Sequence, residues 1–485
     1  MLELLGSPVP GESFSAAATA RGGAAVYFNP ALLAAFAPSA SMTAVVLDQR
    51  LQVERDLRPP GYDVPESVYD ARLAKPGGGT QRLELRPLPT GRLPVPDTAS
   101  EGGANLFLLG GTSFRPHERV GLGLHFVLPT SRFQAQHPHY LDEREQFSSN
   151  ALHFERLGDR LSGMAMSVGL GVGVLDTLAL GLGATLLNDA VARAEVYLPD
   201  AADQSTALTN AHVEVSSRVA PHFAVAVFPF GVARAQTLTL AGTLHLASYG
   251  EVDAISKLRF WNYDYPDGQD ALVQRTRFTY LYEPLRGTLA LSGEVVDSLR
   301  LAGTLRYAGW SGYRARQAAS GARFEDVVEG SLDAAYEIYG WRLGMGGVYA
   351  PSPVPAQTGR TNVVDNDRLG GRLACDYTAA LGDGHLSIGL DLGLQRLMAR
   401  RTLKAASAKT PVLDELPDGA VDARTGAPLP EAAGLQTNNP GFPGFASAGW
   451  LSSAGLTVAW RWGAPEPTHA RMQDSPGDET QDAVE

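Results

Sequence analysis

The sequence holds a single cysteine, Cys375, among 485 residues, which excludes an internal disulfide and any cysteine-rich zinc site. No run approaches the roughly 18 consecutive apolar residues that a membrane-spanning helix needs. The net charge of -12 argues against nucleic acid, because phosphate binding requires clustered Lys and Arg. The mean hydropathy of -0.09 leaves soluble and barrel proteins open, since barrel strands alternate and their average hides the apolar residues.

Alternation of apolar and polar residues with a period of two is the main signal in this chain. In the segment 386–395, Ile388, Leu390 and Leu392 alternate with Ser387 and Asp391. The segment 45–57 likewise has an apolar and a charged face, as a half-buried strand requires. Further segments of the same kind lie at 120–128, 164–174, 178–186, 223–227, 238–246, 299–307, 332–338 and 456–462.

The connections between these segments predict how the strands are arranged. Some are short, at 115–119, 175–177, 295–298, 339–341 and 381–384, whereas 58–103 and 405–444 are long and polar. Short turns at one end and long loops at the other are typical of outer-membrane barrels. The hairpins predict an all-β fold, a transmembrane antiparallel β-barrel of about 14 strands. Leu and Val would form its outer wall, and Arg, Asp and Glu would line the lumen. A soluble β-sandwich or propeller is the alternative, but no propeller repeat of roughly 40 to 50 residues is visible.

Two neighbouring predicted strands have almost no side chains on their inward faces. Gly169, Gly171 and Gly173 lie on one of these faces, and Gly181 and Gly183 lie on the other. Glycine in a strand often marks close approach by another backbone. The N-terminal segment, which contains the small and apolar stretch 15–36, is expected to fill this strip as a hatch, or plug, in the lumen.

The chain therefore divides into three parts. We expect a hatch at 1–38, a barrel with long extracellular loops at 39–462 and an acidic disordered tail at 463–485. The first residues, MLELLGSPVPGESF, show neither the charged start nor the apolar core of a signal peptide. A location in the outer membrane of a Gram-negative bacterium thus presupposes a signal peptide that is not visible in this sequence.

At AAVYFNPALLA the sequence resembles the FadL family of long-chain fatty acid transport proteins, whose hatch carries an Asn-Pro-Ala motif. The motif here is Asn29, Pro30 and Ala31. GVYAPSPVP at 347–355 and VVDNDR at 363–368 resemble the Ser-Pro-Val-Pro loop of the family and the Asp and Arg that follow it. With the strand count, the resemblance extends over most of the chain. The segment before the motif is shorter than is usual in the family.

The resemblance implies a fourteen-stranded barrel closed by a hatch. Hydrophobic compounds would enter from a groove in the outer loops, reach a binding pocket and leave through a lateral wall opening after the hatch rearranges. Asn29, Pro30 and Ala31 would shape the hatch. Pro30 fixes its own φ and favours an extended Asn29, whose amide can satisfy backbone groups. A purely structural turn would use the same chemistry.

A fatty-acid site would combine an apolar tunnel with a cation near the carboxylate. Lumen arginines, however, often pair with lumen acids. The aromatic residues of the loop 249–274 would capture a hydrophobic ligand, lie in the membrane interface or pack within the loop. The candidate ligand-binding residues are Phe28, Leu33, Arg300, Arg306, Arg372, Phe260 and Trp261.

No nucleophile elbow or compact catalytic motif is visible, and His125 and His245 are expected to be ordinary lumen residues. We expect no enzyme activity, no cofactor, no metal and no nucleic acid. The sequence favours a monomeric, passive, gated outer-membrane transporter for hydrophobic small molecules, with long-chain fatty acids foremost. Its partners would be a hydrophobic ligand (fatty acid, detergent or lipid) and membrane lipids. The alternative is a general or substrate-selective diffusion porin for polar solutes.

Overall fold

The computed structural model describes residues 4, 14–56, 98–130, 152–158, 163–199, 207–260, 270–313, 323–359, 361–407, 427 and 439–463. The predicted acidic tail beyond residue 463 therefore lies outside the described residues. None of the described helices has the length and apolar character needed to cross a membrane.

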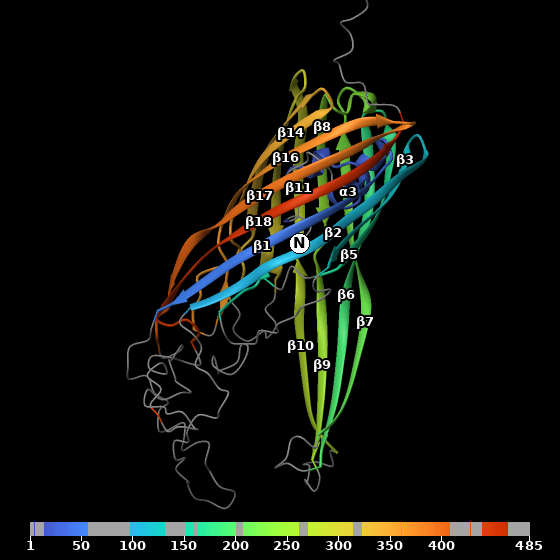
Figure 1. The fold of residues 1–485 in the computed structure, drawn as a ribbon. Coiled ribbons are helices and arrows are strands. Elements are labelled where there is room, and N and C mark those ends of the chain that lie inside the picture. The colour runs from blue at the N-terminus through green and yellow to red at the C-terminus, as the bar shows by residue number, and fades with distance from the viewer. Residues whose placement is uncertain are drawn as a thin grey trace, which may run out of the picture.

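One sheet closes on itself through antiparallel pairings to form the barrel (Figure 1). Sixteen strands belong to the sheet, and because β9 and β10 leave the wall, the closed barrel has fourteen. Closure occurs at β1, which pairs with β2 on one side and with the last strand, β18, on the other. The predicted fold class and strand number are confirmed.

The wall strands run from Ser39 to Trp462. Three short helices precede them: α2 (Ala16–Thr19), α3 (Gly22–Phe28) and the 3-10 helix η1 (Pro30–Ala34). Two further 3-10 helices, η4 (Val232–Arg234) and η6 (Trp310–Gly312), lie between strands. The strands of the barrel wall are β1 (Ser39–Arg55), β2 (Thr98–His117), β3 (Val120–Pro129), β5 (Ala165–Leu175), β6 (Leu178–Leu198), β7 (Leu208–Val227), β8 (Leu238–His245), β11 (Leu285–Val296), β12 (Leu299–Gly309), β13 (Val327–Ile338), β14 (Trp341–Ala350), β16 (Arg368–Leu381), β17 (Gly384–Leu403) and β18 (Gly444–Trp462).

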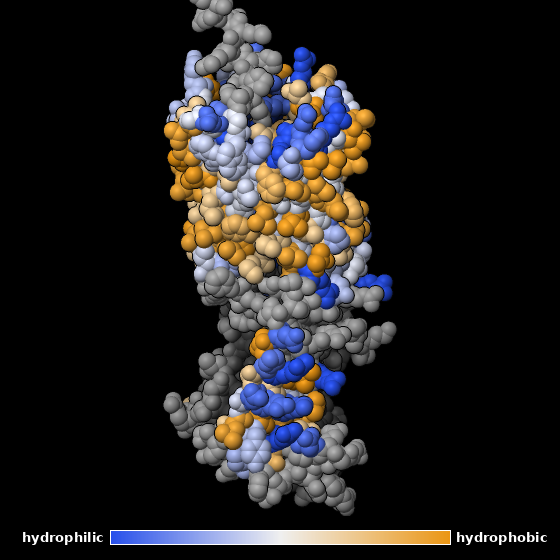
Figure 2. All heavy atoms as spheres, turned by 90° about the vertical axis from the view of Figure 1, so that its right-hand side faces the viewer, coloured by the Kyte–Doolittle hydropathy of each residue, from blue (hydrophilic) through white to orange (hydrophobic). Residues whose placement is uncertain are grey.

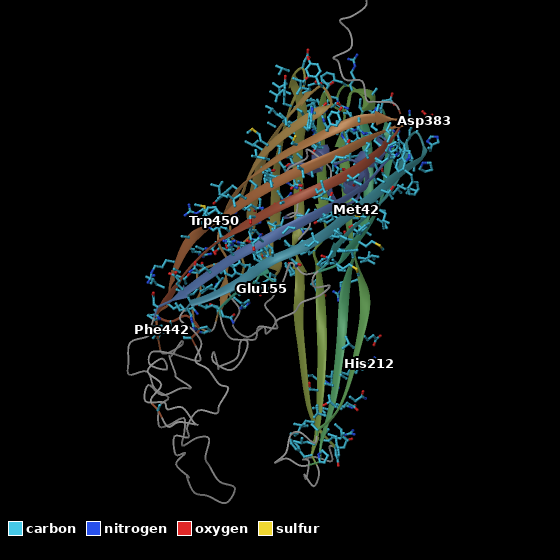
Figure 3. All side chains as sticks on the ribbon, in the orientation of Figure 1. Met42, Glu155, His212, Asp383, Phe442 and Trp450 are labelled. Atoms are coloured by element: carbon cyan, nitrogen blue, oxygen red, sulfur yellow. The ribbon has the colours of Figure 1, made fainter. Side chains whose placement is uncertain are left out.

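The connections at one end of the barrel are tight hairpin turns. Tyr339 and Gly340 join β13 to β14, and both have a positive φ, 48° and 83°, as a two-residue type I′ turn demands. Asp383 marks this end, and Phe442, just before β18, marks the opposite end with the long connections (Figure 3). We call these the short-turn end and the loop end.

Large apolar side chains cover the outside of the barrel. On β17, Leu390 and Leu392 are 61% and 62% exposed, while Asp391 between them is only 9% exposed. Figure 2 shows these hydrophobic residues across one face of the wall. The same alternation holds on β5, β12, β13, β16 and β18, and it confirms the predicted inward and outward faces of these strands.

On β1 the expected polarity is reversed towards the loop end. Val45, Leu47, Leu51 and Val53 are buried inside the barrel, whereas the charged residues of 48–54 point outwards. The prediction of a charged lumen was therefore wrong for this strand. The reason is position, because the charged face of β1 belongs to its loop-end half, while Met42 and Val46 supply its outward apolar residues nearer the short turns.

A four-stranded ribbon extends from the loop end beyond the barrel (Figure 1). The outer parts of β6 and β7 form one hairpin, and β9 (Ser248–Phe260) and β10 (Leu272–Glu283) form the other. The two hairpins join through a parallel pairing in which Ala190 of β6 lies opposite Val252 of β9. The prediction of a loop at 249–274 was therefore wrong for residues 249–260 and 272–274, which belong to β9 and β10, while 261–269 lie outside the described residues.

Candidate functional site

The N-terminal helices lie inside the barrel and pack against glycines of its wall. A Cβ atom placed on Gly171 of β5 would stand 2.4 Å from the carbonyl oxygen of Pro30, and one on Gly181 of β6 would stand 2.2 Å from the nitrogen of Ala31. Real side chains cannot approach backbone so closely, and only glycine leaves the room. The hatch of the predicted fold class thus fills the predicted glycine strip. Gly183 and Gly173 are exceptions, since the ring of His222 covers Gly183 and the nearest atoms to Gly173 belong to Arg119.

Asn29 connects three parts of the site with one fully buried amide. Its Oδ1 accepts a hydrogen bond of 3.1 Å from the backbone N–H of Ala31 and so caps η1. Its Nδ2 donates to the carbonyl of Ala17 in α2 at 2.8 Å and to the carbonyl of Val225 in β7 at 3.4 Å. The side chain therefore fixes the turn after α3, joins the hatch helices and attaches them to the wall.

A second attachment forms around Tyr27, the residue two positions before Asn29. The ring of His245 lies 4.8 Å from the Tyr27 ring, and Arg286 donates to the Tyr27 hydroxyl at 3.3 Å. His222 bonds to the carbonyl of Val26 at 2.7 Å and stacks on His245, with ring centroids 4.6 Å apart and planes 10° from parallel. We call Tyr27, His222, His245 and Arg286 the histidine–arginine cluster.

A pocket opens beside this cluster where the wall strands diverge into the ribbon. The last pair joining β5 to β6 is Met166–Leu186, and β9 meets β6 only from Ala190 onwards. The pocket lies at this interval and has apolar walls with polar groups at its hatch side. Its lining includes Met164, Leu187, Pro221, Leu246, Glu283 and Arg286.

The lumen near β1 contains a buried apolar region towards the loop end. The inward side chains of β1, among them Leu51, lie in one cluster with Leu109 of β2, Leu451 of β18 and Phe154. Phe154 belongs to β4 (His153–Phe154), a short strand that pairs in parallel with β15 (Val363–Val364) inside the mouth of the barrel. The same cluster includes Val26 and Leu33 of the hatch, so buried apolar side chains extend from the hatch to the region around Phe154.

The segment that closes the loop end is held by buried polar contacts. Arg156 pairs with Asp365 at 3.1 Å and with Glu329 at 3.6 Å, and its guanidinium lies 4.9 Å from the centre of the Trp310 ring. Lys404 Nζ donates to the carbonyls of Gly359, Thr361 and Pro440, at 3.0 Å and 2.6 Å for the first two. These contacts place the segments 152–158, 350–359 and 361–367 across the mouth.

The hydroxyl of Tyr307 donates to Asp326 at 2.6 Å, and the backbone N–H of Ser311 donates to the same carboxylate at 2.7 Å. These bonds hold the pKa of the Asp326 carboxyl below its usual range and tie β12 to the residues preceding β13.

A Pseudomonas aeruginosa FadL homologue of known structure matches this chain at 14% sequence identity, with a TM-score of 0.52, over 93% of this chain and 95% of that one. The chain has the FadL-type fold. The P. putida toluene transporter TodX is similar at 10% identity and a TM-score of 0.47, over 92% of this chain and 95% of that one. No protein-family model and no curated protein matches the sequence.

In this FadL-type barrel the three candidate arginines all bond to neighbouring side chains. Arg306 pairs with Glu329 at 3.1 Å, and Arg372 pairs with Asp391. Arg300 donates to Gln236 at 2.8 Å. Their guanidinium groups are therefore engaged within the wall, as lumen arginines often are.

The aromatic and aliphatic candidates are spread over the FadL-type fold. Phe28 and Leu33 are buried in the hatch, where Leu33 contacts the wall glycines. Phe260 ends β9 in the ribbon, paired with Leu198 of β6 and remote from the hatch. Trp261 lies outside the described residues. The structure thus brings Phe28 and Leu33 together and separates Phe260 from them.

The residues that were missed are Tyr27, His222 and Arg286. Alternation does place His222 and Arg286 on inward faces, so their orientation was available from the sequence. Their meeting was not, because it depends on the register of β7, β8 and β11, in which both His222 and Arg286 lie opposite His245. Within the part of the chain that the structure describes, no three metal-binding side chains gather as a metal site would require.

Proposed function

We propose that this chain is an outer-membrane protein that admits hydrophobic small molecules by passive, gated diffusion, with long-chain fatty acids as the foremost substrates. It would act in transport and not in catalysis. The short-turn end would face the periplasm and the ribbon would face the exterior, as in other bacterial barrels. Asn29, Pro30 and Ala31 would set the position of the hatch that gates the path.

The continuous apolar core inside the lumen carries this proposal. Side chains of one buried cluster extend from Val26 and Leu33 in the hatch to Leu51, Leu109 and Phe154 towards the loop end. A channel for polar solutes relies on a wet lumen with charged constrictions. An apolar interior instead favours molecules that leave water readily, since burying apolar surface contributes about 25 cal/mol per Å².

Passive movement is part of the same proposal. The glycine-rich stretch at 171–176 lacks the Lys that a phosphate-binding loop requires. Transport would follow the concentration gradient, and ligand would move by displacing apolar contacts in turn. The lumen charges that pair with one another, such as Arg372 and Asp391, would stabilise the neighbouring wall where β16 pairs with β17.

Liposomes containing the purified protein test the proposal. We expect them to take up a radiolabelled long-chain fatty acid and toluene faster than protein-free liposomes, and not to swell in arabinose. Leu51→Asn, which places a polar group in the lumen, should slow hydrophobic uptake. Gln52→Asn, at the neighbouring outward position, is the matched control and should leave it unchanged. Rapid swelling in arabinose without hydrophobic uptake would favour the diffusion porin.

A further inference from the structure

The histidine–arginine cluster concentrates ionisable groups at the point where the hatch meets the wall. His222 comes from β7, His245 from β8 and Arg286 from β11, and all three contact residues 26–27 of α3 or each other. Glu283 at the end of β10 bonds to Arg286. The charge of Arg306 on β12 also acts on His245.

The stacked histidines have a geometry that suits two uncharged rings. Their centroids are 4.6 Å apart and their planes are almost parallel. Two imidazolium ions face to face at that spacing would repel each other, and Arg286 would add to the repulsion. Glu283 lines the same pocket as His245, and its carboxylate already bonds to Arg286.

We propose that His222 and His245 form a proton-sensitive latch, which holds the hatch when both rings are neutral and loosens it in acid. Histidine is suited to this task because a free imidazole changes its charge between about pH 5 and pH 8, and burial beside Arg286 moves that change only further into the acid range. The latch acts on the hatch through two contacts, the bond from His222 to the Val26 carbonyl and the packing of His245 on Tyr27.

Protonation of both rings forces them apart. His222 keeps its bond to the Val26 carbonyl, because an imidazolium is the stronger donor, so His245 is the ring that withdraws from Tyr27. Asn29, which follows α3 directly, then carries more of the attachment of the hatch through its bonds to Ala17 and Val225. The latch therefore acts two residues from the Asn-Pro-Ala turn. This inference goes beyond the proposed function, because it concerns the hatch and holds for any substrate.

Ion conductance in planar lipid bilayers tests the latch without a hydrophobic ligand. For the purified wild-type protein we expect the open probability to rise about tenfold from about pH 7.5 to about pH 4.0, because a positive charge in this buried site beside Arg286 and Arg306 needs stronger acid than a free histidine does. His245→Phe keeps an aromatic ring against His222 but cannot take up a proton, and it should abolish most of that rise. His222→Gln keeps a donor for the Val26 carbonyl and should do the same.

His125→Phe is the matched control, because His125 is another buried lumen histidine but lies on β3 and outside the cluster. It should respond to acid as the wild type does. Heat-modifiable electrophoretic mobility identifies the variants that form a barrel, and the two cluster variants provide independent tests. The latch is overturned if the wild type shows no acid response, if both folded cluster variants keep it, or if His125→Phe loses it.

Discussion

The carbonyl oxygen of Pro30 occupies the space that a side chain on Gly171 would need, only 2.4 Å from the position of a Cβ. The hatch is thus seated directly on the backbone of the wall. Gly121 and Gly181 show the same relation to Leu33 and Ala31. Close approach of this kind makes the seating of the hatch sensitive to a single added side chain.

Gly171→Val should displace the hatch and leave the barrel formed. Overpacking of this kind typically costs about 1–3 kcal/mol, and the strand itself gains a residue that favours β-structure. We expect higher ion conductance at neutral pH, measured in planar bilayers. Gly287→Val is the control, because a Cβ there meets no atom within 4 Å. Equal conductance of the two variants would show that the hatch does not depend on this contact.

Asn29→Asp should weaken the hatch although the two side chains have the same size. The carboxylate loses the two N–H donors and faces the carbonyl oxygens of Ala17 and Val225. A buried group left without its partner costs about 1–3 kcal/mol. Hydrogen exchange of residues 16–34 should become faster, with little change in the wall strands. Unchanged protection of α2 and η1 from hydrogen exchange would mean that the hydrogen bonds of the Asn29 side chain do not hold these helices in place.

The larger and clashing Asn29→Trp should alter the uptake of hydrophobic molecules without removing the barrel. The amide is fully buried, so an indole cannot occupy its site without moving α2 or η1. Uptake into liposomes measures the effect, and heat-modifiable mobility reports on the barrel. Normal uptake by a folded variant would contradict a gating role for this motif.

Much of the barrel could be predicted because a strand has only two faces. Once Leu390 and Leu392 are known to be apolar and Asp391 polar, the direction of the side chains from 386 to 397 on β17 follows, up to the bulge between Leu397 and Arg400 that reverses the alternation. The glycines of β5 and β6 revealed the hatch for a similar reason, since a wall without side chains needs another filling. Local sequence patterns are therefore enough to predict both the barrel and the presence of a hatch inside it.

The reversal on β1 could not be predicted from alternation alone. Alternation separates two faces but does not say which of them meets lipid, and Leu51 looks the same on either. The answer depends on where along the barrel axis a residue lies and on whether another segment covers it. Here Phe154, about a hundred positions further along the sequence, provides the cover.

The candidate site was predicted only in part, and the reason is again distance along the chain. Arg306 and Arg372 were recognised as inward, but their acidic partners Glu329 and Asp391 depend on strand register. The histidine–arginine cluster joins residues 27, 222, 245 and 286, which no local pattern connects.

Lys404→Met should loosen the loop-end cover and leave the wall intact. The ammonium group is buried and donates to three backbone carbonyls, of which Gly359 and Thr361 belong to one segment and Pro440 to another. Met has a similar length but no donor, so the carbonyls lose their shared partner. Limited proteolysis should cut near residues 357–361 faster than in the wild type. Arg401→Met, at a neighbouring and exposed position, is the control.

Arg156 and Asp365 should be coupled energetically, because both are largely buried and lie 3.1 Å apart. Removal of one partner leaves a buried charge, which typically costs about 3–5 kcal/mol. A double-mutant cycle with Arg156→Gln and Asp365→Asn, measured by urea unfolding in detergent micelles, should show that the second substitution costs much less once the first is present.

Arg156→Gln should also open the mouth, because the segment 152–158 loses its link to Glu329 as well, and hydrophobic uptake should rise. Additive losses of stability would instead mean that Arg156 acts mainly through its contacts with Glu329 and Trp310, and the cover would then depend on the wall more than on the segment 350–367.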